Sequence, residues 1–235
     1  MDNRPIGIFD SGVGGLTVAK EILKALPNEN IVYFGDTARV PYGDKSKEVV
    51  TKYSKQIVRF LLTKNVKAII TACNTVSSNS LDDLRSEFDV PFVGVVEPGV
   101  KSVINTTVNK KVGIIGTEAT IRSCMYSRLI HEADSSIEVF SKPCPLFVPL
   151  AEEGWYDNEV ARLTASMYLN ELVRCGIDTL LLGCTHYPLL KQCIGETIGE
   201  AVKIVDPAKN TALYLKELLE ENDMLNDGSQ KPTNV

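Results

Sequence analysis

The feature that most restricts the fold of this chain is a regular alternation of short apolar runs, rich in β-branched residues, with longer segments of helical period. This alternation is typical of βα-repeating architectures, in which helices cover mostly parallel sheets. Ser46 is expected to cap a long helix, and a last helix is expected at about 208–219. The expected strands are residues 6–9, 31–35, 67–72, 91–96, 111–116, 137–140, 179–183 and 202–206.

The expected strands fall into two sets of four, and the segments that follow them are alike in both sets. DSGVGG after the first strand parallels TEAT after the fifth, and CNT after the third parallels CTH after the seventh. This weak internal duplication predicts an α/β fold of two pseudo-symmetric domains, each a mostly parallel four-stranded sheet flanked by helices. The active site is expected in the interdomain cleft.

The domain boundaries follow from two short connections, EPG and DPA, through which the chain is expected to leave its first half and return to it. We predict a discontinuous N-terminal domain of residues 1–97 plus 207–222 and a second domain of residues 98–206. Residues 223–235 form a polar tail with too few apolar side chains to pack, and we expect this tail to be frayed.

Composition argues against several classes of partner. The net charge is −5 and no block is rich in Lys or Arg, so nucleic acid is not expected as the primary ligand. No apolar run approaches the roughly 20 residues that span a bilayer, and the N-terminus has no long apolar segment, which predicts a cytoplasmic protein without membrane association. The six cysteines include no C-x-x-C pair, which indicates reduced thiols.

Reactive and polar side chains follow four of the predicted strands. In open α/β sheets the ligand crevice lies beyond the carboxyl ends of strands, where helix N-termini present unpaired backbone N–H groups. Such helix ends suit an anionic group, for example an α-carboxylate. The four clusters are Asp10-Ser11, Cys73-Asn74-Thr75, Thr117 to Thr120, and Cys184-Thr185-His186.

Cys73 and Cys184 occupy equivalent positions in the two halves, each expected at a helix N-terminus, where the pKa of a thiol is lowered. Across a cleft they would lie on either side of one bound molecule. Inversion of a stereocentre by proton transfer needs a base on one face of the carbon and an acid on the other. The pair therefore predicts a cofactor-independent amino-acid racemase, with Asp10 assisting Cys73 and His186 assisting Cys184.

Eight segments, which together cover nearly the whole chain, carry a family resemblance. They are GIFDSGVGGLTV (7–18), YFGDTARVPYG (33–43), TACNT (71–75), GVVEPG (94–99), GTEATIRS (116–123), CPLFVPLAEEG (144–154), GCTHYPLL (183–190) and VDPA (205–208). With these segments the chain resembles the cofactor-independent aspartate/glutamate racemase family. The resemblance implies interconversion of L- and D-glutamate without pyridoxal phosphate, other cofactors or a metal. It also implies a bacterial cytoplasmic enzyme, commonly a homodimer, that supplies D-glutamate for peptidoglycan.

The resemblance also implies roles for single residues. Cys73 and Cys184 would be the acid/base pair, and Asp10, Glu152 and His186 would be polar catalytic assistants. The residues implied to bind the amino acid are Asp10, Ser11, Pro41, Tyr42, Gly43, Cys73, Asn74, Thr75, Thr117, Thr120, Cys184, Thr185 and His186, with residues 41–43 closing over it. One departure is Val76, where a smaller residue is usual; it would narrow the pocket or adjust helix packing.

Parts of the sequence also fit other functions. The GVG segment at 12–14 and Asp36 are placed as in a dinucleotide-binding enzyme, but Thr17 stands where the third glycine is needed. A cysteine hydrolase would use one thiol as nucleophile and leave the other without a role. A zinc module would need two ligands beyond one Cys and one His. Among racemases, aspartate and hydantoin substrates stay open on chemical grounds.

Overall fold

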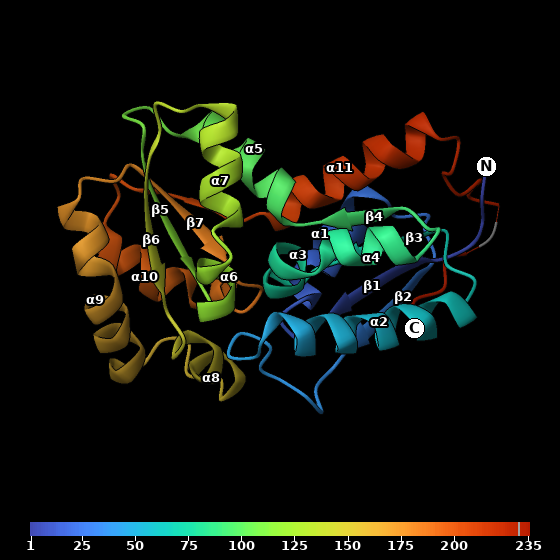
Figure 1. Ribbon diagram of the computed structural model, residues 1–235, viewed down its shortest axis with the longest axis horizontal. Coiled ribbons are helices and arrows are strands. Elements are labelled where there is room, and N and C mark those ends of the chain that lie inside the picture. Colours follow the sequence, from blue (N-terminus) through green and yellow to red (C-terminus); the bar gives the residue numbers. More distant parts are fainter. Residues whose placement is uncertain (230) are drawn as a thin grey trace.

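The computed structural model describes residues 1–229 and 231–235, which contain two parallel four-stranded sheets (Figure 1). The strand order is β2-β1-β3-β4 in the first sheet and β6-β5-β7-β8 in the second, so the same topology occurs twice. The predicted fold class is therefore confirmed. The strands are β1 (Ile6–Asp10), β2 (Ile31–Gly35), β3 (Ala68–Thr71), β4 (Phe92–Gly94), β5 (Lys111–Gly116), β6 (Glu138–Pro143), β7 (Thr179–Gly183) and β8 (Lys203–Val205).

Helices pack on both faces of each sheet. The first sheet with α1–α4 and α11 is called the first lobe, and the second sheet with α5–α10 is called the second lobe. Helix α11, red in Figure 1, packs beside α1 on the first sheet although it comes last in the chain. The residue boundaries of the two domains stay a prediction. The helices are α1 (Leu16–Ala25), α2 (Lys47–Thr63), α3 (Asn74–Asn79), α4 (Leu81–Glu87), α5 (Val96–Thr106), α6 (Glu118–Arg122), α7 (Met125–Ala133), α8 (Phe147–Glu152), α9 (Glu159–Arg174), the 3₁₀ turn η1 (Tyr187–Leu190), α10 (Lys191–Ile198) and α11 (Ala208–Glu221).

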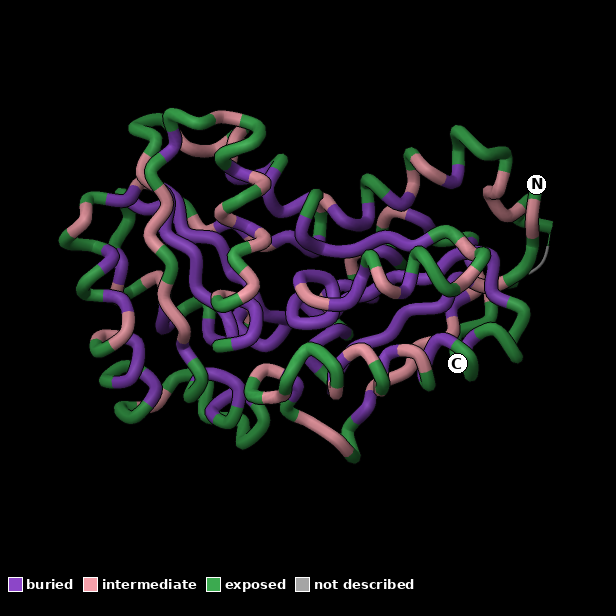
Figure 2. Tube along the Cα trace, viewed as in Figure 1, coloured by how far each residue is buried: buried purple, intermediate pink, exposed green. Residues whose placement is uncertain are grey.

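The central strands are buried along almost their whole length (Figure 2). Every residue of β1 and of β7 is buried, whereas the edge strand β6 has no buried residue. A strand that is covered on both faces needs apolar side chains at successive positions, which explains why the sequence shows continuous apolar runs without polar alternation. No helix in the described ranges is long and apolar enough to cross a bilayer.

Two expectations about local structure have different outcomes. Ser46 caps α2 as expected, since the Val49 N–H donates to Ser46 Oγ at 3.4 Å. The EPG connection, in contrast, is the first turn of α5, which shortens the strand expected at 91–96. Pro98 fits this turn because the first N–H groups of a helix have no intrahelical partner to lose.

Residues 231–235 of the C-terminal tail are not frayed, contrary to our expectation. The backbone N–H groups of Ile31 and Tyr33 donate to the carbonyl oxygens of Thr233 and Val235, at 2.9 and 2.8 Å. The Val235 N–H donates in return to the Ile31 carbonyl at 3.0 Å. The reason is that β2 is an edge strand, whose outer backbone groups would otherwise have no partner in the sheet.

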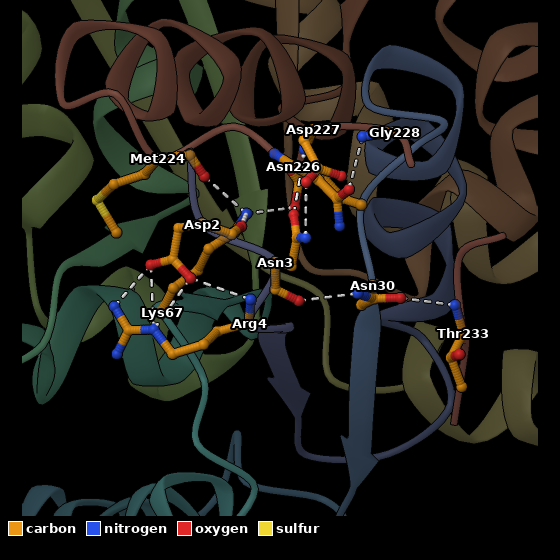
Figure 3. A network of polar contacts seen from close by, with 11 residues as sticks. Asp2, Asn3, Arg4, Asn30, Lys67, Met224, Asn226, Asp227, Gly228 and Thr233 are labelled. Carbon is orange, nitrogen blue, oxygen red and sulfur yellow. Dashed lines mark hydrogen bonds and ion pairs between the residues drawn. The ribbon is translucent and has the colours of Figure 1, made fainter. Parts of the chain in front are cut away.

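A buried lysine lies where both chain ends meet the first lobe (Figure 3). Lys67 Nζ donates to the carbonyl oxygens of Asp2 and Met224, each at 2.7 Å, and pairs with Glu29 Oε2 at 2.5 Å. The Lys67 and Glu29 side chains are 0% and 2% exposed. This network joins the N-terminus, the segment before β2 and the segment after α11. No local pattern in the sequence indicates this network, because its partners are far apart in the chain.

Candidate active site

The four predicted clusters lie at the carboxyl ends of the two central strands of each sheet, β1, β3, β5 and β7. Side chains from both lobes line one buried cavity there. Cys73 reaches it from the first lobe and Cys184 from the second, with 4% and 6% of their surfaces exposed. The lining residues are Ser11, Val40, Pro41, Tyr42, Gly43, Cys73, Asn74, Thr75, Thr117, Val148, Cys184, Thr185 and His186.

Some predicted residues support the cavity from behind its surface. Asp10 is fully buried, and its carboxylate accepts hydrogen bonds from the N–H groups of Gly12 and Gly15, at 3.1 and 3.0 Å. Thr185 Oγ1, from the second lobe, donates to the same carboxylate at 3.3 Å. Thr120 likewise lies outside the lining. Glu152 is also absent from it and contacts the lining residue His186.

Glu152, His186 and Cys184 form a chain of contacts in the second lobe. Glu152 Oε1 lies 2.5 Å from His186 Nε2, and His186 Nδ1 lies 3.9 Å from Cys184 Sγ. A carboxylate beside one ring nitrogen favours the proton on that nitrogen and leaves the other as an acceptor. The arrangement can therefore take a proton from the Cys184 thiol and return it.

The surroundings of Cys73 are different. Its thiol donates to Ser11 Oγ at 3.6 Å, and the residue is the N-cap of α3. Asp10 has no hydrogen bond to the sulfur among the described contacts and acts on it through charge. The two thiols thus have unequal surroundings, with a carboxylate at a distance from Cys73 and a histidine in contact with Cys184.

Burial, more than helix position, decides the protonation of both thiols. It raises the pKa of Cys73 from 9.0 to about 11, and the Asp10 carboxylate raises that pKa further, while N–H groups oppose the shift. Burial also raises the pKa of Cys184 well above its ordinary value. The expectation of lowered thiol pKa values was wrong. Helix α3 has only six residues, and the 3₁₀ turn after Cys184 begins at Tyr187, so neither helix end outweighs desolvation.

The loop at 41–43 is held against the second lobe. The Ala119 N–H donates to the Gly43 carbonyl at 2.9 Å, and a Cβ added to Gly43 would lie 2.4 Å from Thr117 Cβ. The Tyr42 hydroxyl donates to Asp36 Oδ2 at 2.5 Å, and the same oxygen pairs with Arg39 at 2.7 Å. Asp36 therefore holds the loop, a function that we did not predict, and its carboxylate is not free to bind a ribose.

Hydroxyl groups of three threonines join the lobes beside the cavity. Thr75 Oγ1 lies 2.9 Å from Thr117 Oγ1, which donates to Thr120 Oγ1 at 3.0 Å. Val76 is fully buried in the core between the first sheet and α2, so the departure noted in the sequence affects helix packing and not the lining. Val40 and Val148 do line the cavity, and as apolar residues they carried no chemical signal in the sequence.

Comparison with known proteins agrees with this geometry. Residues 6–215 match the Asp/Glu/Hydantoin racemase family. The chain belongs to this family. A glutamate racemase of Geobacter metallireducens is 56% identical over 231 residues, which cover 98% of this chain and 86% of the relative.

Solved structures of family members have the same fold. Glutamate racemase from Francisella tularensis, crystallised with D-glutamate, superposes with a TM-score of 0.93 at 43% identity, covering 100% of this chain and 87% of that one. A glutamate racemase isoform from Bacillus anthracis gives a TM-score of 0.95 at 40% identity, covering 100% and 88%. Membership of the racemase family replaces the dinucleotide and hydrolase alternatives. As to zinc, no group of three or more His, Cys, Asp or Glu side chains within residues 1–229 and 231–235 is arranged to hold a metal ion.

Proposed function

We propose that this chain is a glutamate racemase, which interconverts L- and D-glutamate by proton transfer between two cysteines without a cofactor. The observation that carries the proposal is that Cys73 and Cys184 line one buried cavity from opposite lobes. Two acid/base groups on opposite sides of one carbon are what inversion requires. The choice of glutamate is supported by the names of the relatives and by the D-glutamate in the Francisella tularensis structure.

In the proposed reaction one cysteine is a thiolate and the other a thiol. The thiolate removes the α-proton from one face of glutamate, and the electron pair of the C–H bond stays on carbon as a carbanion. The opposite thiol then protonates the other face. Each turnover leaves the two cysteines with exchanged protonation states, which suits a reaction whose substrate and product are mirror images.

We infer that formation of the first thiolate is coupled to substrate binding, because burial raises the pKa of both thiols and so favours their neutral form. The α-ammonium group of glutamate would bring a positive charge close to the sulfur atoms and favour a thiolate there. His186, backed by Glu152, would accept the proton of Cys184. On the Cys73 side Asp10 would assist as a proton carrier, because burial raises the pKa of this carboxyl group and a proton on it removes the negative charge that opposes a Cys73 thiolate.

The polar lining supplies binding groups for the two carboxylates and the ammonium group. Hydroxyl and amide donors come from Ser11, Asn74, Thr75, Thr117 and Thr185. Pro41, Tyr42 and Gly43 would cover the bound amino acid, and Thr120 would orient Thr117 through the hydrogen bond between them. A covered site excludes water, which strengthens each of these interactions at the developing charge.

The proposal also includes location and assembly. We place the enzyme in a bacterial cytoplasm, as a homodimer that supplies D-glutamate for peptidoglycan. The relatives that support this location come from bacteria. Sedimentation equilibrium should give twice the chain mass, and a monomer at micromolar concentration would contradict this assembly.

The activity is tested with protein freed of metal and pyridoxal phosphate. L-Glutamate should lose its circular dichroism signal, and in D₂O the α-hydrogen should be replaced by deuterium. Cys73→Ala and Cys184→Ala should each abolish racemisation, whereas Cys193→Ala, which changes a buried thiol away from the cavity, should retain it. Turnover in either active-site variant would remove the two-thiol mechanism, and racemisation of aspartate or a hydantoin in preference to glutamate would change the substrate.

A further inference from the structure

A tyrosine outside the predicted site holds one of the cavity side chains. The Tyr126 hydroxyl donates to Asn74 Oδ1 at 2.6 Å, and both residues are buried. Asn74 belongs to α3 in the first lobe and follows Cys73 directly, whereas Tyr126 belongs to α7 in the second lobe. The hydrogen bond therefore crosses between the lobes next to the proposed acid/base pair.

The Tyr126 ring lies close to two glycines, which leave little room around it. A Cβ added to Gly99 would lie 3.1 Å from one ring carbon, and a Cβ added to Gly183, the residue before Cys184, would lie 3.6 Å from another. Burial, and after it the carboxylates of Glu97 and Asp206, raise the pKa of Tyr126, so its hydroxyl keeps the proton that it donates. The donor is thus fixed in position and in protonation state.

The orientation of the Asn74 amide follows from this donor. A primary amide has an acceptor oxygen and two N–H donors on opposite branches. Because a permanent donor occupies Oδ1, the Nδ2 branch is turned away from Tyr126. Among the described residues Nδ2 donates to no protein atom, although Asn74 is only 4% exposed and lines the cavity. The N–H groups are therefore left for a ligand.

We propose that Tyr126 is a positioning residue for substrate binding, whose hydroxyl keeps the N–H groups of Asn74 directed at a carboxylate of the bound amino acid. The proposal rests on the proposed function, since it takes the ligand to be glutamate. Without the hydroxyl the amide can rotate by half a turn and present its oxygen, which repels a carboxylate. Since the bond joins the two lobes, the packing of the second lobe against the first determines the orientation of this amide.

The test is a double-mutant cycle of Tyr126→Phe and Asn74→Ala, measured by steady-state racemisation from both enantiomers. Tyr126→Phe should raise KM for glutamate about tenfold, as expected for one hydrogen bond, with a smaller change in kcat. In the Asn74→Ala background the same change should leave KM within about twofold, because no amide remains to be oriented. Equal effects in both backgrounds, or an unchanged KM in the single variant, would overturn the proposal.

A matched control separates positioning from general stability. Thr211→Val removes another buried hydroxyl, which donates to the Pro207 carbonyl at 2.9 Å in α11, and should lower the melting temperature without changing KM. A KM change in Thr211→Val as large as that in Tyr126→Phe would overturn the specific role.

A second readout does not depend on turnover. The side-chain NH₂ signals of Asn74, assigned by their loss in Asn74→Ala, should shift in the ¹H–¹⁵N spectrum of Tyr126→Phe. Shifted signals in a protein that does not racemise glutamate would refute the proposed substrate while leaving the tyrosine–asparagine contact intact. Unshifted signals would refute the positioning role itself, whatever the activity.

Discussion

Replacing Glu152 with Gln should slow racemisation about tenfold while leaving the fold intact. The change keeps the size of the side chain and removes the charge that lies 2.5 Å from His186 Nε2. A hydrogen bond to a charged group contributes about 1.5–3 kcal/mol. The Glu152 side chain is 33% exposed, so water screens the charge and the lower figure applies. About 1.5 kcal/mol in the transition state corresponds to about tenfold in kcat.

The direction of the reaction makes this prediction more specific. L- and D-glutamate are equally stable, so kcat/KM must be the same in both directions for any variant and at any pH. A difference between the directions can therefore occur only in isotope effects and in kcat, with KM changing by the same factor as kcat. If Glu152 assists Cys184, the slowed step is α-proton removal in one direction and return of a solvent proton in the other. The kinetic isotope effect on kcat from deuterium at the α-carbon of the substrate should therefore rise in the first direction and fall in the second.

The assay follows circular dichroism with each enantiomer, protonated and α-deuterated. Glu153→Gln is the control, because it removes the same charge from the next residue, which is exposed. A Glu152→Gln enzyme whose isotope effects change alike in both directions would refute one-sided assistance. An equal loss of kcat in Glu153→Gln would refute the role of the contact with His186.

Three further predictions concern a buried thiol, a buried ion pair and the loop at 41–43. Burial raises the pKa of Cys73 from 9.0 to about 11, so between these pH values the folded chain keeps a proton that the unfolded chain has lost. The free energy of unfolding should therefore fall as pH rises through this range. Urea titrations at each pH should show a smaller fall in Cys73→Ala. Lys67→Met leaves a buried carboxylate without its partner and should lower the free energy of unfolding, measured with urea, by about 3–5 kcal/mol. Lys24→Met, in an exposed ion pair, should lower it by less than about 1 kcal/mol. Similar losses in the two variants would show that the buried ion pair contributes no more than an exposed one. Gly43→Ala forces the loop away from the threonine that it contacts and should raise KM for glutamate. Gly195→Ala, whose Cβ meets one atom at 3.8 Å, should behave as wild type. An unchanged KM in Gly43→Ala would show that the loop does not close over the substrate.

The sequence alone was sufficient to predict the fold class and to bring the reactive residues to one place. Continuous apolar runs alternating with helical segments specify strands covered on both faces, and this information is local. The carboxyl ends of the central strands meet at one edge of a sheet whatever the details of packing. Because Cys73 and Cys184 follow equivalent strands of the two duplicated halves, they could be predicted to face one cleft between the domains before any contact was known.

Only the tertiary structure decided how those residues behave. Local position at a helix start indicated reactive thiols, but the packing of two lobes removes water from both sulfur atoms and reverses the direction of their pKa shifts. The contact of Glu152 with His186, the contact of Tyr126 with Asn74 and the pairing of the tail with β2 join residues that are 34, 52 and about 200 positions apart. Such partners have no spacing that a sequence pattern could show, because they meet only when separate elements pack together.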